Sequence, residues 1–268
     1  TITTRSGYGS PDDGEVTKIQ QYEAGGVLLV TTVMTHDAWG NMLTARQFGN
    51  AKGRSADFTQ TYSYNAKFEL CRHHTPEQGA TVYIYDAAGQ MVHTKSGGPG
   101  LTGCTQSLGS SWTTYSYDAL GRVTNINYPA GTPDIAYTYD NNGNVTSVSR
   151  GGVVWSYTYH YSGDADLIKR ETLSIDGRAY VTKYEYNILG DMKTKEFPSG
   201  LRIEMDPNAL GQQRSARAAS GGTAFASQVS YHPNGLINRF DFGNGSYFTQ
   251  QLDDRQLPAA RGFSGAFV

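Results

Sequence analysis

The sequence has little charge, few cysteines and no long apolar run, and each shortage excludes a class of protein. Charged residues make up 17% of 268 residues and the formal net charge is -2. No basic stripe is present to displace counterions from phosphates, which argues against nucleic acid as a partner. The longest apolar run extends from Val27 to Val30, far short of the roughly 20 residues that a membrane-spanning helix needs.

The spacing of the two cysteines and the composition of the first residues argue against two further kinds of motif. The spacing of Cys71 and Cys104 matches no zinc or redox motif, so a single disulfide and two buried thiols both stay open. The start of the chain has no basic stretch followed by an apolar run, which argues against a signal peptide in this numbering. It has no initiator Met either, and we expect that the chain was cut from a longer one.

Tyrosine and glycine are abundant instead. The chain contains 19 Tyr and 32 Gly, and aromatic residues reach 12%. Aromatic and β-branched side chains suit a pleated surface, and Gly supplies turns. This composition predicts a β-rich protein.

A short phrase, Tyr-x-Tyr-[Asp/Asn/His]-x-x-Gly, recurs over most of the chain, and internal repeats of this kind indicate a repeat architecture. Its copies are worn to different degrees. The four clear copies place the motif on Tyr83, Tyr85, Asp86, Gly89; Tyr115, Tyr117, Asp118, Gly121; Tyr137, Tyr139, Asp140, Gly143; and Tyr184, Tyr186, Asn187, Gly190. Weaker copies are Thr35–Gly40, Tyr62–Phe68, Tyr157–Gly163, Ser230–Gly235 and the remnant Gln251–Leu257.

Each copy predicts a β-hairpin of roughly 20 residues. Tyrosines two residues apart point to one face of a strand, and the acid and the glycine occupy the first and fourth positions of a type I turn. A second reversal follows at Pro-x-Gly or a similar turn, such as Pro129 to Gly131. Isolated hairpins are marginal in water, so we expect neighbours to stack their tyrosine faces into a continuous curved antiparallel sheet.

Long helices are not predicted. The stretches Asp166–Leu173 and Met205–Ser220 have weak apolar spacing and are interpreted as elaborated connections between strands. Residues Ser96–Gly103 and Ala218–Gly222 are rich in Gly and Ser and predict surface loops.

The repeated phrase with its Pro-x-Gly turns resembles the YD repeat of the bacterial Rhs (rearrangement hot spot) family, whose relatives include Tc-toxin cocoon subunits and teneurins. The resemblance covers roughly Val33 to Leu257 and is most diagnostic over Tyr128–Val148. It implies a β-sheet that spirals into a hollow shell around a C-terminal toxin. We therefore divide the chain into an N-terminal flank (1–32), a YD-repeat shell (33–257) and a C-terminal extension (258–268).

The resemblance assigns no catalytic residue to this chain. The family's self-cleaving aspartyl site lies in a C-terminal segment that this sequence lacks. Asp206-Pro207 is interpreted as a worn YD turn. We expect no catalysis, no cofactor and no metal. The expected partners are the rest of the chain's own Rhs polypeptide, an enclosed toxin domain and components of a secretion system. An edge-to-edge dimer is a further option, and we expect the protein to be secreted or delivered, or to lie at a bacterial surface.

Other candidate sites have simpler structural explanations. His73 and His74 are adjacent and would face opposite sides of a strand, so they cannot chelate one metal. The histidines at 36, 160 and 232 fall at or beside turn positions. Asp253 and Asp254 lie in a degenerate turn, and Cys71 is better explained as a structural thiol or half of a disulfide than as a nucleophile.

Three functions remain to be compared. The first is structural encapsulation by a wall of hairpins. The alternative is a carbohydrate- or cell-surface-binding module that would use exposed aromatic side chains, including Trp39, Trp112 and Trp155. The third, an enzyme such as a β-propeller, ranks last, because a propeller blade needs roughly 40–50 residues per repeat.

Overall fold

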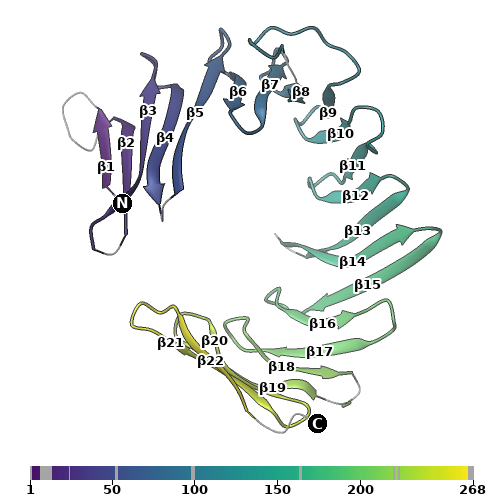
Figure 1. The fold of residues 1–268 in the computed structure, drawn as a ribbon. Coiled ribbons are helices and arrows are strands. Elements are labelled where there is room, and N and C mark those ends of the chain that lie inside the picture. The colour runs from purple at the N-terminus through teal and green to yellow at the C-terminus, as the bar shows by residue number, and fades with distance from the viewer. Residues whose placement is uncertain are drawn as a thin grey trace. The chain divides into compact units, whose positions relative to one another are not determined.

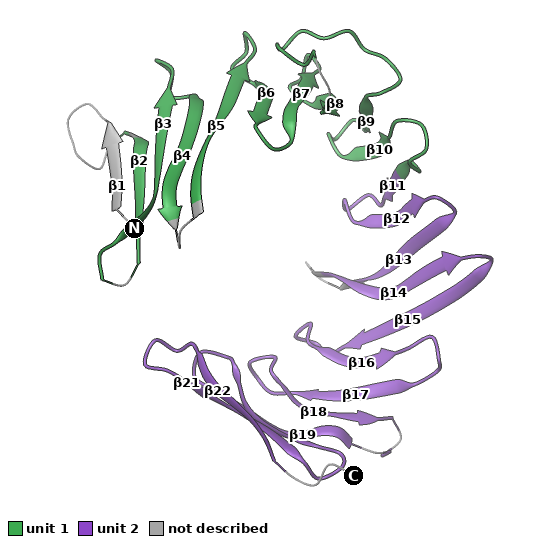
Figure 2. Ribbon diagram, in the orientation of Figure 1, with its two compact units in different colours: residues 1–135 green, residues 136–268 purple. Residues whose placement is uncertain are grey.

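The computed structural model describes residues 2–6, 14–23, 25–51, 54–97, 100–162, 165–219, 221–222 and 224–264. This part of the chain contains 22 strands and no helix. It divides into two compact units, Thr1–Ile135 and Ala136–Val268 (Figures 1 and 2). The predicted all-β fold class is therefore confirmed.

Unit 1 consists of antiparallel strands that pair in the order of the sequence, from β1 with β2 to β9 with β10 (Figure 1). The strand β11 (Ile135–Tyr139) contains the division between the units. The strands of unit 1 are β1 (Ile2–Ser6), β2 (Glu15–Tyr22), β3 (Leu28–His36), β4 (Met42–Ala51), β5 (Arg54–Tyr64), β6 (Leu70–Thr75), β7 (Gly79–Tyr85), β8 (Met91–Ser96), β9 (Thr113–Tyr117) and β10 (Val123–Asn127).

Unit 2 continues in the same manner, and each strand from β12 to β22 pairs with the next in antiparallel fashion. Its strands are β12 (Val145–Arg150), β13 (Val153–Ser162), β14 (Ala165–Ile175), β15 (Arg178–Tyr186), β16 (Met192–Glu196), β17 (Arg202–Pro207), β18 (Gln213–Ala218), β19 (Ala224–Tyr231), β20 (Ile237–Phe242), β21 (Tyr247–Leu252) and β22 (Pro258–Ser264).

Each unit is a sheet one layer thick. Within a unit, the described strands contact only the strands before and after them in the sequence. Soluble domains normally bury apolar side chains between two packed layers. Here only five hydrophobic residues among those described are buried, namely Cys71, Ala80, Val82, Leu101 and Trp112. Most other side chains are half-buried or exposed.

The two stretches interpreted as connections are strands, so that prediction was wrong. Asp166–Leu173 lies within β14. Its pairing with β13 contains a bulge, because Thr158 opposes Arg170 while Tyr159 opposes Ile168. Lys169 is the extra residue of this bulge. It interrupts the alternation of apolar and polar side chains by which a strand is predicted from sequence.

The stretch Met205–Ser220 holds the end of β17, a turn and β18, and Ser220 lies outside the described residues. The predicted loop Ser96–Gly103 is also partly outside them. Its described part is not wholly at the surface, because Leu101 is 6% exposed. The loop predicted at 218–222 begins within β18, since Ala218 is the last residue of that strand.

Candidate functional site

The repeated structural site is the hairpin turn that carries the acid and the glycine of the motif. In the copy at Asp118, the Gly121 N–H donates to the Asp118 carbonyl at 3.0 Å, and the Asp118 N–H donates to the Arg122 carbonyl at 2.9 Å. The carboxylate Oδ1 accepts the N–H groups of Leu120 and Arg122 at 2.9 and 3.0 Å. Gly121 has φ +79°, a left-handed conformation that L-residues with a side chain adopt at a cost. One side chain and one glycine thus fix the reversal.

Eight turns share this arrangement, in which the first residue accepts the backbone N–H groups two and four positions later. Their first residues are Asp37, Asn65, Asp86, Asp118, Asp140, Asn187, Asn208 and Asp253. The pKa of Asp118 is held below its ordinary value, chiefly because its carboxylate accepts the Arg122 N–H. The pKa of Asp37 is lowered chiefly by the side chain of Asn41, and that of Asp253 by the N–H of Leu257.

In six of these eight turns the side chain four positions after the first residue complements it. Where such a turn begins with Asp, a donor side chain follows: Asn41 Nδ2 lies 2.8 Å from Asp37 Oδ2, Arg122 Nε lies 2.7 Å from Asp118 Oδ2, and Asn144 Nδ2 lies 3.1 Å from Asp140 Oδ2. The turn at Asp253 departs from this pattern, because Leu257 stands at the fifth position. Where the turn begins with Asn, an acceptor follows. These pairs are Asn65 with Glu69 at 2.6 Å, Asn187 with Asp191 at 2.9 Å, and Asn208 with Gln212 at 2.9 Å.

This donor–acceptor matching was not predicted from the sequence, although both partners are visible in six of the eight turns. The pairing explains why Asp and Asn interchange at the first position, because each retains its backbone acceptor Oδ1 while its second atom selects a partner.

A second recurring contact links each hairpin to the one before it. The second tyrosine of the repeated phrase donates its hydroxyl hydrogen to a backbone carbonyl of the preceding hairpin. Pairs of this kind include Tyr64 with Met42, Tyr85 with Leu70, Tyr117 with Met91, Tyr159 with Val145, Tyr186 with Ile168 and Tyr231 with Gln213, at 2.7–2.9 Å. We call this set the tyrosine ladder.

In two copies of the motif that lack the second tyrosine, a glutamine side chain donates to the backbone carbonyl in its place. Pro207 occupies the tyrosine position before Asn208. The Met192 carbonyl that this tyrosine would reach accepts Gln213 Nε2 at 2.9 Å instead. Leu252 replaces the tyrosine before Asp253, and Gln250 Nε2 donates to the Ile237 carbonyl at 3.2 Å. A buried carbonyl without a donor is costly, which explains the compensation.

Burial raises the pKa of five of the ladder tyrosines further above neutral pH, where a tyrosine hydroxyl is a protonated donor. It is the largest cause at Tyr64, Tyr85 and Tyr117 in unit 1 and at Tyr186 and Tyr231 in unit 2. Tyr184, the first tyrosine of its copy, has its pKa raised to about 12 by burial and, secondarily, by Glu171.

The predicted turn residues are distributed as follows. In the copies at Tyr83–Gly89, Tyr115–Gly121 and Tyr184–Gly190, both tyrosines end a strand and the Asp or Asn begins the turn. In the copy at Tyr137–Gly143, both tyrosines lie in β11 and Asp140 begins the turn. Of the sixteen positions in these four copies, Gly89, Gly121 and Gly143 are exposed and the other thirteen are half-buried.

Two turn predictions differ from the structure. Asp206 and Pro207 belong to β17, and the worn turn begins at Asn208. His160 lies in β13 opposite Leu167 and is not at a turn, while Gly163, which ends that copy, lies outside the described residues. His232 does begin a turn, since Gly235 N–H donates to its carbonyl at 2.9 Å.

The remaining histidine and acid candidates are not brought together. The His73 ring stacks on Tyr62 with centroids 4.6 Å apart and lies 3.1 Å from Gln60 Oε1. Asp253 holds its own turn and pairs with Arg255 at 2.9 Å. Across the residues that the structure describes, no group of three or more His, Cys, Asp or Glu could hold a metal ion. The absence of catalysis and of cofactors stays a prediction.

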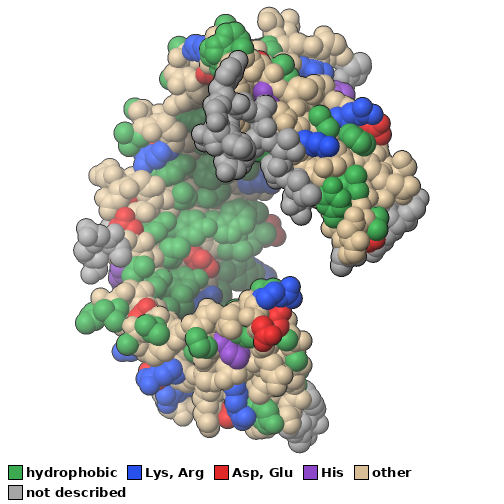
Figure 3. All heavy atoms as spheres, turned by 90° about the vertical axis from the view of Figure 1, so that its left-hand side faces the viewer, with side chains coloured by type: hydrophobic (Ala, Val, Ile, Leu, Met, Phe, Trp, Pro, Cys, Tyr) green, Lys and Arg blue, Asp and Glu red, His purple; other side chains and the backbone are tan. Residues whose placement is uncertain are grey.

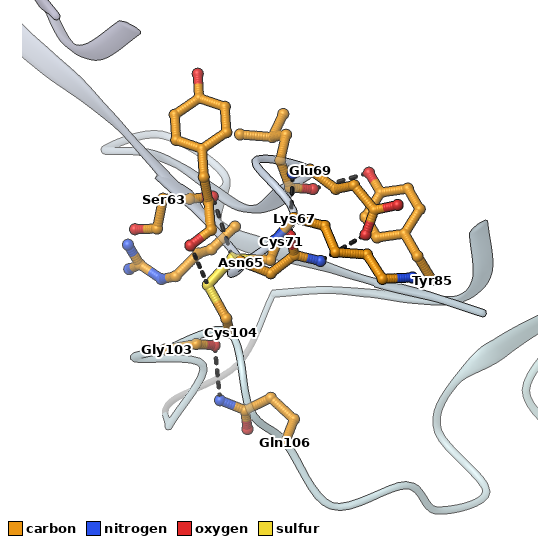
Figure 4. Close-up of a disulfide and its surroundings, with 12 residues drawn as sticks. Ser63, Asn65, Lys67, Glu69, Cys71, Tyr85, Gly103, Cys104 and Gln106 are labelled. Atoms are coloured by element: carbon orange, nitrogen blue, oxygen red, sulfur yellow. Dashed lines mark hydrogen bonds between the residues drawn. A yellow bond between two sulfur atoms is a disulfide. The ribbon is translucent and has the colours of Figure 1, made fainter. Parts of the chain in front are cut away.

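Cys71 and Cys104 are brought together as a disulfide (Figure 4). Their Cα atoms are 5.1 Å apart, within the range that a disulfide requires. Cys71 lies in β6, and Cys104 lies in the long connection between β8 and β9. That connection returns over the sheet, and its Leu101 and Trp112 pack on Ala80 and Val82 of β7. The oxidised state in solution stays a prediction.

Among the described residues, one of the three tryptophans is buried, and the face shown in Figure 3 carries charges of both signs. Trp39 is 73% exposed, while Trp112 is 5% exposed and cannot join an exposed row. Figure 3 shows acidic and basic side chains interspersed on the face in view. The ion pairs are mostly at the surface, such as Arg46 with Asp57 and Arg214 with Asp206. Within the described ranges, no helix has the length and apolar character needed to cross a membrane.

The fold defines a class of protein: a repeat protein in which tandem antiparallel hairpins add edge to edge in a single layer. Residues 101–133 match the family model described as RHS Repeat. The recognition of an Rhs-type repeat from its tyrosine–aspartate phrase is thereby confirmed. None of the curated protein sequences compared with the chain matches it.

Solved structures of Tc toxins have the same fold. A mutant Tc holotoxin pore of Photorhabdus luminescens superposes with a TM-score of 0.59 at 12% identity, over 87% of this chain and 14% of that one. A TcdB2–TccC3–Cdc42 structure gives 0.58 at 12% identity, over 92% and 16%. TcdB2–TccC3 without its hypervariable C-terminal region gives 0.57 at 12% identity, over 92% and 16%. This chain therefore spans about a sixth of the length of these relatives.

Proposed function

We propose that this chain is a wall segment of an Rhs-type shell that encloses or carries a C-terminal toxin domain of the same polypeptide. The single-layer sheet is the observation that carries the proposal. A sheet with a half-apolar face and no second layer leaves that face to be covered by something else. In a wall, the enclosed material provides the cover.

The apolar face is developed most strongly in the last strands of unit 2. Phe240, Phe242, Phe248 and Phe263 form a chain of ring contacts across β20, β21 and β22, with centroids 4.7–6.4 Å apart. Phe263 is 59% exposed. An exposed aromatic surface of this kind would promote aggregation of a free-standing domain. The inner surface of a closed shell does not contact other molecules in solution, so it would not promote aggregation.

The hairpin design suits a wall as well. Most of the described turns are closed by the side chain of an Asp or Asn together with a residue of positive φ, and hairpins are fastened to the preceding ones by the tyrosine ladder or, in the worn copies, by a glutamine. Repeats that contact only their neighbours extend a sheet without a central core. The role needs no catalytic group, and we propose that the chain has no activity of its own. We also propose that the division into flank (1–32), shell (33–257) and extension (258–268) holds.

Delivery and partners belong to the same proposal. Two of the similar solved structures contain TcdB2 together with TccC3, and a third is a Tc holotoxin pore. We propose that this chain is likewise secreted or delivered with its toxin, with secretion-system components as transient partners. Among the described residues, the exposed strand β22 pairs with β21 alone, and we propose that other parts of the shell cover its second side.

The test is protection of the toxin domain. The coding region on both sides of this segment is sequenced, and the complete polypeptide is expressed and treated with a low concentration of protease. The C-terminal domain is expected to survive in the native polypeptide and to be cut once the wall is unfolded in denaturant. A complete polypeptide without any further domain, or one whose C-terminal domain is cut as fast as the isolated domain, refutes the proposal.

A further inference from the structure

The connection between β8 and β9 contains a segment, residues 101–112, that lies across the sheet of unit 1 and that we call the strap. It covers the side of β7 that presents Ala80 and Val82, with Ile84 beside them. Leu101 and Trp112 are the two strap residues in this cluster, at 6% and 5% exposed. The strap therefore supplies half of the buried cluster in this part of the chain.

Side-chain contacts hold the end of the strap to the sheet: Trp112 packs on β7, its ring meets the His93 ring edge-on at 6.5 Å, and Lys95 Nζ lies 5.9 Å from its centroid. The strap's backbone hydrogen bonds among the described residues are local, from Thr102 to Gly100 and from Trp112 to Gly109. The Trp112 indole also donates within the strap, to the Ser107 carbonyl at 3.2 Å. A segment without ladder hydrogen bonds to its support opens at low free energy unless something else fastens it.

Two contacts fasten the first half of the strap. Arg72 Nε of β6 donates to the Leu101 carbonyl at 2.7 Å, and the disulfide joins Cys104 to Cys71 of the same strand (Figure 4). The disulfide is the one covalent link. Its two sulfur atoms differ in access, because Cys71 is 2% exposed and Cys104 is half-buried.

We propose that this disulfide is a reduction-sensitive clasp: a small thiol releases the strap and uncovers an apolar patch on β7. A thiolate attacks Cys104 Sγ, the bond to Cys71 Sγ breaks, and Cys71 leaves as a thiolate that takes up a proton. A second thiolate then attacks the sulfur of the first thiol in this mixed disulfide, and Cys104 leaves as a thiolate that takes up a proton. Two thiols are oxidised to one disulfide, and the protein disulfide is reduced to two thiols. The strap stays seated in oxidising surroundings and opens in thiol-rich ones.

The experiment uses the full chain, with dithiothreitol as the thiol. Free thiols are first counted under denaturing, non-reducing conditions, where the oxidised protein is expected to show none of its 2 cysteines. Hydrogen exchange is then followed by mass spectrometry in the native protein with and without reductant. Exchange in residues 101–112 is expected to accelerate by about tenfold or more on reduction, while peptides from β15 and β16 of unit 2 stay unchanged.

Tryptophan fluorescence gives a second readout. Trp39 and Trp155 are already exposed, so a red shift on reduction reports Trp112. The Cys104→Ser variant should show the open strap without reductant, and reduction of the unaltered chain keeps the test valid should this variant fold poorly.

Three results would overturn the proposal. Two reactive thiols in the isolated protein would show that the clasp does not form. Unchanged exchange and emission after complete reduction would show that the strap stays seated without it. Accelerated exchange throughout β6 to β9 would show that the disulfide supports the whole sheet and does not act on the strap alone. None of these results bears on whether the chain encloses a toxin.

Discussion

The donor–acceptor matching in the turn at Asn187 predicts that a one-atom change will destabilise the hairpin and that a second change will rescue it. Asn187 Nδ2 donates to Asp191 Oδ2 at 2.9 Å, and Asn187 Oδ1 accepts two backbone N–H groups. Asn187→Asp keeps the acceptor oxygen and replaces the donor by a second carboxylate oxygen. The turn itself is preserved while its partner is repelled.

The expected loss follows from two contributions. A hydrogen bond to a charged group contributes about 1.5–3 kcal/mol. Two like charges about 4 Å apart repel by about 1 kcal/mol in water. Because both side chains are half-buried and water screens part of this, we expect Asn187→Asp to lower the free energy of unfolding by about 2 kcal/mol.

The rescue is Asp191→Asn in the same chain. The double variant recreates the arrangement found at Asp140, where Asn144 Nδ2 donates to Asp140 Oδ2 at 3.1 Å. Its stability should return to within about 0.5 kcal/mol of the original. Asp191→Asn alone should cost less than Asn187→Asp, because an amide can rotate to offer its oxygen.

Urea denaturation followed by circular dichroism measures all three variants, with the midpoint compared at constant slope. A double variant as unstable as Asn187→Asp would refute the matching rule. So would an Asn187→Asp chain with an unchanged midpoint.

Three further perturbations test the ladder, the glycine and the carboxylate. Tyr85→Phe removes a ladder hydroxyl and should cost about 1 kcal/mol. Tyr83→Phe in the same strand should cost less, because no hydroxyl bond of Tyr83 occurs among the described residues; equal urea midpoints would contradict the ladder. Gly121→Ala should cost about 1–2 kcal/mol at φ +79°, and an unaltered thermal midpoint would exclude this strain. Because the folded pKa of Asp118 is lowered, its stabilisation is present above the unfolded value near 3.9 and fades as pH falls through the folded one. Asp118→Asn should therefore flatten the loss of stability as the pH falls below the unfolded pKa, and an identical pH profile would count against this.

The hairpins could be predicted from the sequence because their signals are local. The acid and the glycine of a turn lie three residues apart, and four residues of chain are enough to close the hydrogen bonds between them. The alternation of Tyr115 and Tyr117 needs only the pleat of one strand. All-β structure and tandem hairpins follow from such signals alone.

The contacts between hairpins could not be predicted in this way. The partner of the Tyr186 hydroxyl is the carbonyl of Ile168, and identifying it requires the register of two hairpins. That register depends on bulges such as the one between β13 and β14, which leave no clear mark in composition. The buried position of Trp112 depends on a connection that folds back over the sheet, and its Gly- and Ser-rich sequence indicated a surface loop.

The neighbour-only contacts of the hairpins have a consequence for inheritance. A duplication or deletion that adds or removes one whole strand pair leaves the bonds inside every other pair intact. The tyrosine of the next copy then finds an equivalent carbonyl on its new neighbour. Genes of this kind can therefore gain or lose whole hairpins. The copies at Pro207 and Leu252 show that a hairpin can lose its ladder tyrosine when a glutamine makes the equivalent hydrogen bond.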